Sequence, residues 1–461
     1  MRRIAKLWIL LLLLPAMTGL ADSNTTAATG VEATRATPAS VSTNVARRPW
    51  AGTGPVLIWE VALGDGFGSA VVAGNEVFVL DSEGRQFDVL RAFDLASGQE
   101  LWNYRYEAND THPGGYDGSR AAPAVDDKRV YTLGRMGHLH AIDRTTHKPA
   151  WNFNLVPDHA ARVPYHAFSN NPLLVRDLVV VWADSRKGGM AAFKKDTGVL
   201  AWRARRFGVG ETYMSPMLIT HQGVEQIVML NDKSLIAFHP EDGQTLWEYT
   251  DVACMQPIAP PLFMEDGRVF LSSGATPRAY MLKVIREGGK WTTTQLAHNP
   301  HIGLQMHAPI RVGDHLYFLG NSNSRPREGL LCVDMELNLK WQTKRTIDFR
   351  HGDFKLVAGV IYAMDQAGIL HAILPDPEKY TELAQAPVLP AKDDGEGPIW
   401  AAMTFAGTKL LCRNQRMMRC YELSPDAEHR PAKVWSVRAP TVIPRKTARQ
   451  PPVGTPTIQM P

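Results

Sequence analysis

Ten polar or aromatic residues of this 461-residue chain stand just before short apolar segments, and together they offer hydrogen-bonding groups and aromatic rings. Turns need mainly Gly, Pro, Asn, Asp and Ser, so these side chains are richer in chemistry than connecting loops require. Polar groups that converge beside aromatic rings are typical of a site for a small ligand or a peptide. The ten residues are Arg120, His166, Asn170, Tyr213, Gln305, His307, Arg350, His351, Asp353 and Trp400.

The same residues also allow more specific chemistry and a structural alternative. Asp353 could orient the imidazole of His351 for acid/base work. His166, His307 and His351 could meet as metal ligands, but nothing in their spacing requires it, so we predict no metal site and no catalytic residue. In the structural alternative, these side chains cap strand ends and bind water. If they line a wet channel, replacing His307 and Arg350 should leave stability nearly unchanged.

A repeated motif sets where these residues fall along the chain. It reads AFDLASGQELW at 92–102, AIDRTTHKPAW at 141–151, AFKKDTGVLAW at 192–202 and AFHPEDGQTLW at 237–247, with looser copies at 332–341 and 420–423. A fixed period of this size indicates a repeat architecture. The tryptophans that mark the period are Trp59, Trp102, Trp151, Trp202, Trp247, Trp291, Trp341 and Trp435, with one missing between the last two.

Each repeat contains four short apolar segments separated by turn residues, which is the pattern of four β-strands. Four-stranded antiparallel units at this spacing predict an all-β fold, a single eight-bladed β-propeller. The connections into the eight innermost strands open at one end of such a ring. The ten residues, with Glu211 and Gln256, should therefore converge there. The glycine before each tryptophan fits a turn with positive φ, and the tryptophan would cover the seam between blades.

Closure of the ring needs a strand from the other end of the chain. Either LIWEV at 57–61 or KVWSV at 433–437 could complete the last blade, and the sequence leaves both open. Residues 375–398 read as an insertion in the seventh blade, where a tryptophan strand is missing.

The two ends of the chain differ from the repeat region. Residues 1–21 have a basic start, an apolar run and a small-residue cleavage site, which predicts a secretory signal. Residues 22–49 are rich in Ala, Thr and Ser, and residues 439–461 are rich in Pro, so we predict a disordered linker and a disordered tail around a propeller at 50–438. No stretch is long and apolar enough to predict a membrane span. We expect an exported, soluble monomer, periplasmic or secreted.

Cysteine usage and charge exclude some classes of protein. Four cysteines are too few for a disulfide framework. Cys412 and Cys420 flank a predicted hairpin, so they form either a cross-strand pair or two buried thiols. The formal net charge of +4 is spread along the chain, which gives no ground for a nucleic-acid partner.

The chain resembles the PQQ-like, or quinoprotein alcohol dehydrogenase-like, family of β-propeller repeats. The repeated AFD-x-x-TG-x-x-x-W motif carries this resemblance over about residues 55–437. The stretches 306–319, 354–373 and 399–423 are most similar to bacterial PQQ-binding-like propeller proteins of the cell envelope. The resemblance implies an eight-bladed propeller, but fold alone does not fix function.

Two relatives within that family imply different functions. Quinoprotein alcohol dehydrogenases hold pyrroloquinoline quinone (PQQ) with calcium beneath a vicinal disulfide, whereas no two cysteines are adjacent here. The propeller of the outer-membrane barrel-assembly machine is a lipoprotein scaffold, whereas this chain lacks a lipobox cysteine. We expect a binding or scaffold protein that engages a protein, peptide or carbohydrate through one ring face and is not an enzyme. The alternative is a PQQ-dependent oxidoreductase, and the site features for PQQ with calcium are absent from the sequence.

Overall fold

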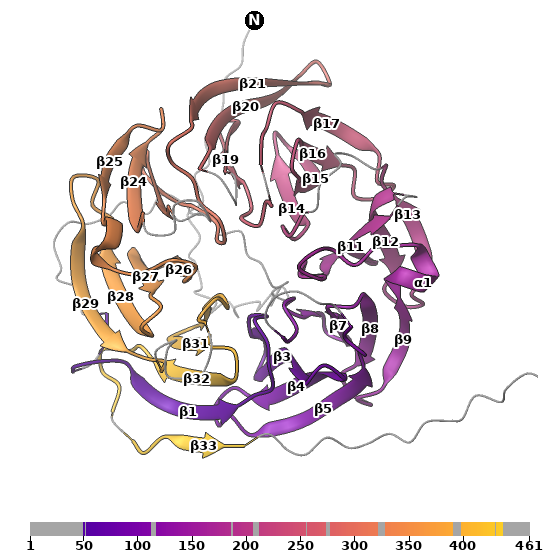
Figure 1. Cartoon of the computed structure of the whole chain (residues 1–461), viewed down its shortest axis with the longest axis vertical. Coiled ribbons are helices and arrows are strands. Elements are labelled where there is room, and N and C mark those ends of the chain that lie inside the picture. Colours follow the sequence, from indigo (N-terminus) through magenta and orange to yellow (C-terminus); the bar gives the residue numbers. More distant parts are fainter. Residues whose placement is uncertain are drawn as a thin grey trace, which may run out of the picture.

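The computed structural model describes residues 49–436, except 51, 112–116, 186–187, 206–211, 255, 273–276, 321–327, 391–397 and 429. Eight β-sheets stand around a central axis and form a closed ring (Figure 1). The predicted all-β fold, an eight-bladed propeller of four-stranded antiparallel blades, is confirmed. The predicted signal, nearly all of the predicted linker and the predicted tail lie outside the described residues. In the part of the chain that is described, no helix is long and apolar enough to cross a membrane.

Blades 1 to 4 follow one another along the chain, each with its strands in order from the centre outwards. Blade 1 contains β2 (Val71–Ala73), β3 (Glu76–Glu83), β4 (Phe87–Asp94) and β5 (Glu100–Glu107). Blade 2 contains β6 (Ala124–Val125), β7 (Arg129–Leu133), β8 (His138–Asp143) and β9 (Pro149–Asn154), followed by the short helix α1 (Leu155–His159). Blade 3 contains β10 (Leu173–Val175), β11 (Leu178–Ser185), β12 (Gly188–Lys194) and β13 (Leu200–Arg203). Blade 4 contains β14 (Met217–His221), β15 (Val224–Leu230), β16 (Leu235–Phe238) and β17 (Thr245–Tyr249).

Blades 5 to 7 keep the same order. Blade 5 contains β18 (Leu262–Phe263), β19 (Arg268–Ser272), β20 (Ala279–Glu287) and β21 (Lys290–Asn299). Blade 6 contains β22 (Ile310–Val312), β23 (His315–Leu319), β24 (Leu330–Asp334) and β25 (Leu339–Gln342), followed by the 3-10 turn η1 (Lys344–Thr346). Blade 7 contains β26 (Phe354–Val357), β27 (Val360–Met364), β28 (Ile369–Leu374) and β29 (Thr381–Pro387).

Blade 8 closes the ring with strands from both ends of the chain. It contains β30 (Thr404–Ala406), β31 (Lys409–Arg413), β32 (Met417–Glu422), β1 (Val56–Ala62) and β33 (Lys433–Trp435). Strand β1 pairs antiparallel with β32 and parallel with β33, so it lies between them (Figure 1). Of the two candidates, the segment 57–61 is therefore the closing strand, and residues 433–435 add a fifth strand outside it.

The repeated tryptophan has one fixed place in the sheets. It stands opposite a small or medium residue of the third strand, next to a bulge, as Trp102 does opposite Ala92. Six blades carry tryptophan there, and Ala297 and Ala384 hold the place in blades 5 and 7. The residues at this place in the six blades are Trp59, Trp102, Trp151, Trp202, Trp247 and Trp341.

Two further predictions of the tryptophan pattern are wrong. Trp291 fits the period but pairs with Arg286, near the turn of the β20–β21 hairpin. Residues 381–387 are not an insertion, because they form β29, the outermost strand of blade 7. In these two blades alanine stands at the place that tryptophan holds in the other six.

Each of these six tryptophans contacts the next blade, and we call their place in the sheet the latch position. The indole of Trp59 donates to the carbonyl oxygen of Leu95 at 2.9 Å and covers Gly98, where an added Cβ would lie 2.5 Å from the ring. Trp202 makes the same contacts with Pro240 and Gly243. The glycines need their positive φ, which is 74° at Gly98, and they leave room for the indole. The predicted seam-covering role is therefore confirmed.

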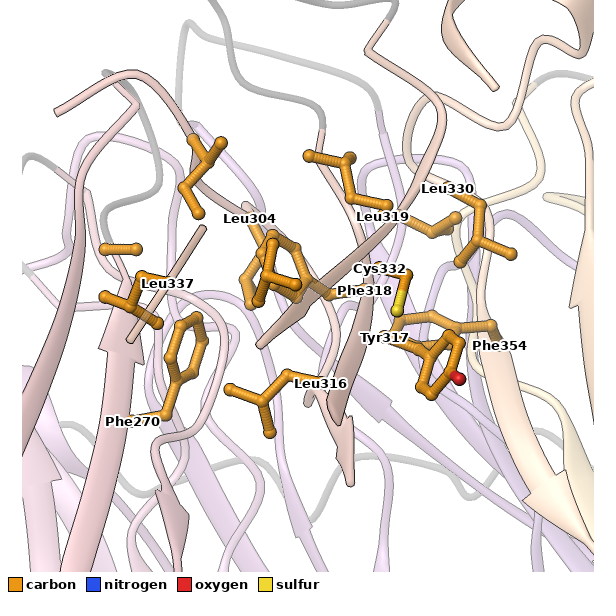
Figure 2. Close-up of a cluster of buried hydrophobic side chains, with 14 of the residues drawn as sticks. Phe270, Leu304, Leu316, Tyr317, Phe318, Leu319, Leu330, Cys332, Leu337 and Phe354 are labelled. Atoms are coloured by element: carbon orange, nitrogen blue, oxygen red, sulfur yellow. The ribbon is translucent and has the colours of Figure 1, made fainter. Parts of the chain in front are cut away.

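The core lies between the blades, and consecutive residues of a middle strand face different neighbours. In β23, Phe318 packs toward blade 5, with its ring centroid 5.4 Å from that of Phe270. Tyr317 lies instead on the side of Phe354 of blade 7, together with Cys332 of its own blade (Figure 2). Because both faces of these strands are covered, they read as continuous apolar runs rather than alternating ones.

The four cysteines are all buried free thiols. Cys412 stands opposite Arg419, while Cys420 stands opposite Leu411, one position along the ladder. Neighbouring positions of a strand project to opposite faces, so the two thiols belong to different seams. A disulfide between Cys412 and Cys420 is excluded.

Candidate binding site at the mouth of the propeller

All ten residues singled out in the sequence lie on the connections that lead from one blade into the innermost strand of the next. Arg120 precedes β6, His307 precedes β22, Asp353 precedes β26 and Trp400 precedes β30. Corresponding connections of a closed ring are related by rotation about its axis, so they open at the same end. We call this end of the ring the mouth.

A continuous row of side chains joins blades 6, 7, 8 and 1. Nε2 of His351 lies 2.9 Å from Oε1 of Gln305, and the imidazole stands edge-on to the indole of Trp400 at 5.5 Å. Trp400 in turn stacks on Phe67, with centroids 5.2 Å apart and planes 29° apart. The row therefore combines an amide, an imidazole and two aromatic faces.

Arg120 extends the row to blade 2. Its guanidinium carbon lies 5.6 Å from the ring centroid of Phe67, within reach of a cation–π contact. Burial lowers the pKa of Arg120 to about 10, and the nearby Arg135 acts in the same direction. The side chain still carries its charge at neutral pH.

His307 and Asp353 form a second, buried part of the mouth. Nδ1 of His307 lies 3.1 Å from Oδ1 of Asp353, and Lys355 lies 3.4 Å from the same oxygen. The other carboxylate oxygen accepts the backbone N–H of Met403 at 2.7 Å, which ties blade 7 to blade 8. Burial lowers the pKa of His307, while the Asp353 carboxylate acts against this shift.

The burial of these two residues changes one expectation. The His307 side chain is 11% exposed, and that of Asp353 is fully buried. Removing the imidazole would leave a buried carboxylate with one partner fewer, which destabilises a protein. Replacement of His307 by alanine should therefore destabilise the protein, in contrast to the prediction for a residue in a wet channel.

His166 and Tyr213 form a third group, on the side of blades 3 and 4. The Tyr213 hydroxyl accepts the backbone N–H of His166 at 3.1 Å, and their rings lie 5.4 Å apart. Gln256 of the next connection reaches the His166 ring at 3.4 Å. Asn170 is fully buried and donates to the carbonyl oxygen of Met214, so it braces this group from below the surface.

Arg350 has a local partner. Its Nε and Nη2 donate to the carboxylate of Asp348 at 2.7 and 2.6 Å. A bidentate pair of this kind holds the guanidinium in place and neutralises it.

The structure therefore brings the predicted residues together at the mouth in three groups, with Arg350 in its own ion pair. Phe67 was missed by the sequence analysis. The first repeat, GDGFGSA, offers it at the corresponding place, but an apolar residue gave no chemical signal. Among the residues that the structure describes, no group of three or more His, Cys, Asp or Glu side chains is arranged to hold a metal ion.

Comparison with protein families gives a match over more than half of the chain. The family model described as outer membrane protein assembly factor BamB matches residues 86–336. Among curated proteins, the dehydrogenase subunit of a quinone alcohol dehydrogenase from Gluconacetobacter polyoxogenes is 26% identical over 125 residues. That match covers 25% of this chain and 17% of the relative, so the chain spans a small part of that protein's length.

Solved structures of both kinds share the fold. BamB from Moraxella catarrhalis has a TM-score of 0.56 and 13% identity, over 82% of this chain and 100% of that chain. Quinohemoprotein alcohol dehydrogenase from Comamonas testosteroni has a TM-score of 0.55 and 13% identity, over 82% of this chain and 77% of that chain. At these identities the likeness concerns the fold alone.

Proposed function

Because the chain belongs to the family described as outer membrane protein assembly factor BamB, we propose that it is a binding or scaffold protein of the cell envelope. In this proposal a protein, peptide or carbohydrate partner docks on the mouth of the propeller. Export to the envelope is part of the proposal.

One observation carries the proposal: the row from Gln305 through His351, Trp400 and Phe67 to Arg120 spans five successive blades. Gln305 and Phe67 are buried within this row, whereas His351, Trp400 and Arg120 are partly exposed and offer an imidazole, an indole and one cation. Aromatic and arginine side chains of this kind are enriched in protein interfaces. Their contacts with one another fix them before a partner arrives, which lowers the entropic cost of binding.

A quinoprotein-type oxidoreductase is the second candidate, favoured by the likeness to the alcohol dehydrogenase subunit. Calcium beside the quinone would need six to eight oxygen ligands, by the usual coordination of that ion. Described carboxylates on the connections at the mouth already have cationic partners: Asp353 has His307 and Lys355, and Asp348 has Arg350. The carboxylates of Asp65, Asp110 and Asp117 are paired with arginines. The described residues do not fit the calcium ion, so we derive no reaction step through the cofactor.

The docking face can be tested by site-specific photo-cross-linking in the cells that make the protein. Tyr165 stands beside His166 at the mouth and is 67% exposed, so a benzophenone amino acid there should capture the partner. Asp314 is 84% exposed on the turn after β22, at the opposite end of that strand, and serves as the control position. Capture from position 165 that is lost in Trp400→Ala supports the proposal. Equal capture from both positions, or capture from 314 alone, refutes it.

A separate measurement addresses the second candidate. PQQ and calcium chloride are added to the purified protein, and the reduction of a dye is followed after addition of ethanol. We expect no ethanol-dependent reduction. Turnover that requires both PQQ and calcium would establish the oxidoreductase instead.

A further inference from the structure

A buried carboxylate lies directly beneath the mouth, at the seam of blades 1 and 2. Asp88 is 1% exposed and accepts hydrogen bonds at Oδ1 from the hydroxyls of Ser82 at 2.6 Å and Ser119 at 3.0 Å. The hydroxyl of Tyr106 lies 3.3 Å from Oδ2. A Cβ added at Gly134 would lie 2.4 Å from Oδ2, so this side of the carboxylate is closely covered by backbone. Three hydroxyl donors around one carboxylate stabilise its ionised form.

Ser119 connects this carboxylate to two residues of the mouth. Its carbonyl oxygen accepts the backbone N–H of Phe67 at 2.7 Å, and Arg120 is the next residue in the chain. Its own backbone N–H donates to the hydroxyl of Ser82 at 3.0 Å. The backbone that carries Phe67 and Arg120 is therefore anchored on Ser82, Ser119 and Asp88.

The groups that face Asp88 set its affinity for a proton. Burial raises the pKa of Asp88 to about 6, whereas the three hydroxyls and the charge of Arg135 act in the opposite direction. On the far side of Tyr106 lies His140, whose ring stacks on the phenol at 4.0 Å. Burial and the neighbouring His138 lower the pKa of His140, so it stays neutral where Asp88 titrates.

Thr132 supplies a place for the hydroxyl hydrogen that protonation would displace. Its buried hydroxyl lies beside that of Tyr106, and its oxygen can accept a hydrogen bond from the phenol. A proton on Oδ2 of Asp88 would make that oxygen the donor to Tyr106, whose own hydrogen would turn to Thr132. The bonds from Ser82 and Ser119 would then end on a neutral acid, and hydrogen bonds to neutral groups are weaker than those to charged ones.

We propose that Asp88 is a positioning residue of the mouth, which holds Ser119 firmly as a carboxylate and less firmly as an acid. The placement of Phe67 and Arg120 then depends on pH, and with it the fit of the partner. Its meaning for binding rests on the proposed function, but the positioning itself does not.

The test needs no partner. A single 4-fluorophenylalanine is placed at position 67 of the full chain, and its ¹⁹F signal is recorded across the range in which histidines and perturbed carboxylates titrate. The signal should shift or broaden with a midpoint at about 6. This transition should disappear in Asp88→Asn, which keeps the shape of the side chain and removes its titration.

Matched variants separate Asp88 from other groups. His351→Gln removes a titratable ring at the mouth, and the transition should persist there. Ser119→Ala leaves Asp88 intact and removes its direct hydrogen bond to this residue, so that only the path through Ser82 remains and the transition at position 67 should become smaller. This variant also decides the matter if Asp88→Asn does not fold.

Two results would overturn the proposal. One is a signal from position 67 that stays flat in the wild-type protein. The other is a transition that survives unchanged in Asp88→Asn or in Ser119→Ala. Neither result would affect the cross-linking test of the docking face, so failure of this proposal and failure of the proposed function are distinguishable.

Discussion

The imidazole of His147 lies flat on the indole of Trp102, with ring centroids 4.6 Å apart and planes at 11°. His147 stands where the neighbouring repeats have the turn glycines Gly98 and Gly198, and it keeps their backbone shape, with φ of 58°. At the seam of blades 1 and 2, a ring that stacks on the indole therefore stands where other seams have a glycine that leaves room for it.

His147→Gly should change the free energy of unfolding by no more than about 1 kcal/mol. The loss of stacking, about 0.5–1.5 kcal/mol, is offset by the relief of a left-handed conformation that costs other residues about 1–2 kcal/mol. His147→Ala loses the ring and keeps the strain, so it should be clearly less stable than His147→Gly. Urea denaturation measures both, and equal stabilities would contradict this account.

Gly98→Ala should be more destabilising than Gly74→Ala. Both glycines have positive φ, 74° and 65°, so both variants bear a conformational cost of about 1–2 kcal/mol. An added Cβ at Gly98 meets the Trp59 ring at 2.5 Å, whereas one at Gly74 meets nothing within 4 Å. The difference between the two thermal unfolding midpoints therefore measures the displacement of the tryptophan. If the midpoints coincide, the contact does not contribute.

Trp202→Ala should cost about 3–5 kcal/mol, as expected for a large buried aromatic side chain. Trp202 is 8% exposed and lies over Gly243 of the next blade. Trp435→Ala is the control, because Trp435 is 36% exposed on the added strand β33 and should cost far less. Chemical denaturation measures the free energy of unfolding of both variants. Similar decreases would show that a tryptophan at the latch position contributes no more to stability than an exposed one.

Removing residues 50–62 should destabilise the whole ring by at least about 3 kcal/mol, the cost of one large buried side chain. This deletion takes away β1 and with it Trp59, which is fully buried. Ending the chain after residue 432 removes β33, whose three residues are all exposed, and should have a small effect. Calorimetry of both truncated proteins provides the comparison. Equal transition temperatures would place ring closure elsewhere.

His140 should make the protein sensitive to acid. Burial lowers its pKa to about 3, so the folded state keeps it neutral. The unfolded chain takes up a proton at about 6.5, the ordinary value for histidine. Its stabilising contribution is therefore fully present above that value and is lost as the pH falls toward the folded pKa. The stability of His140→Gln should fall less steeply over this range than that of the wild-type protein.

An exposed histidine provides the control for that measurement. The side chain of His239 is 39% exposed, so His239→Gln is the matched surface substitution with which the His140→Gln profile is compared. A His140→Gln profile parallel to that of the wild type would mean that His140 is protonated in the folded protein.

The fold was predictable because the repeated motif contains both a residue of the turn, the glycine, and a residue of the contact between blades, the tryptophan. Gly98 and Trp59 meet across a seam, so the glycine and tryptophan of the motif report tertiary contacts as well as local turns. Trp291 was misread because a period counts residues, whereas the register of the β20–β21 hairpin decides which residue reaches the seam. Ala384 was not identified because nothing in the sequence distinguishes an alanine at the tryptophan position from any other alanine.

From the sequence, only the end of the ring at which the site residues lie was predictable, because corresponding positions of the blades are related by rotation about the axis. The sequence placed His351 and Gln305 at the same end of the ring, because both precede innermost strands. Whether two such side chains touch depends on their rotamers and on the length of each connection, which no period contains. The full burial of Asp353 likewise depends on blade 8, whose Met403 comes 50 residues later.

Strand β1 has a consequence for the order of events in the cell. Arg419 of β32 donates to Glu60 of β1 across 359 residues of chain. A ribosome makes β1 first and β32 near the end, so β1 waits for almost the entire synthesis without the strand that it pairs with. Until residue 422 has been made, Trp59 can pack against blade 1 only, because the remaining strands of its own sheet are missing. A chain whose synthesis stops early therefore exposes part of an indole and an unpaired strand edge. Proteases and chaperones can recognise both features, so an incomplete ring differs from a complete one in a way that the cell can detect.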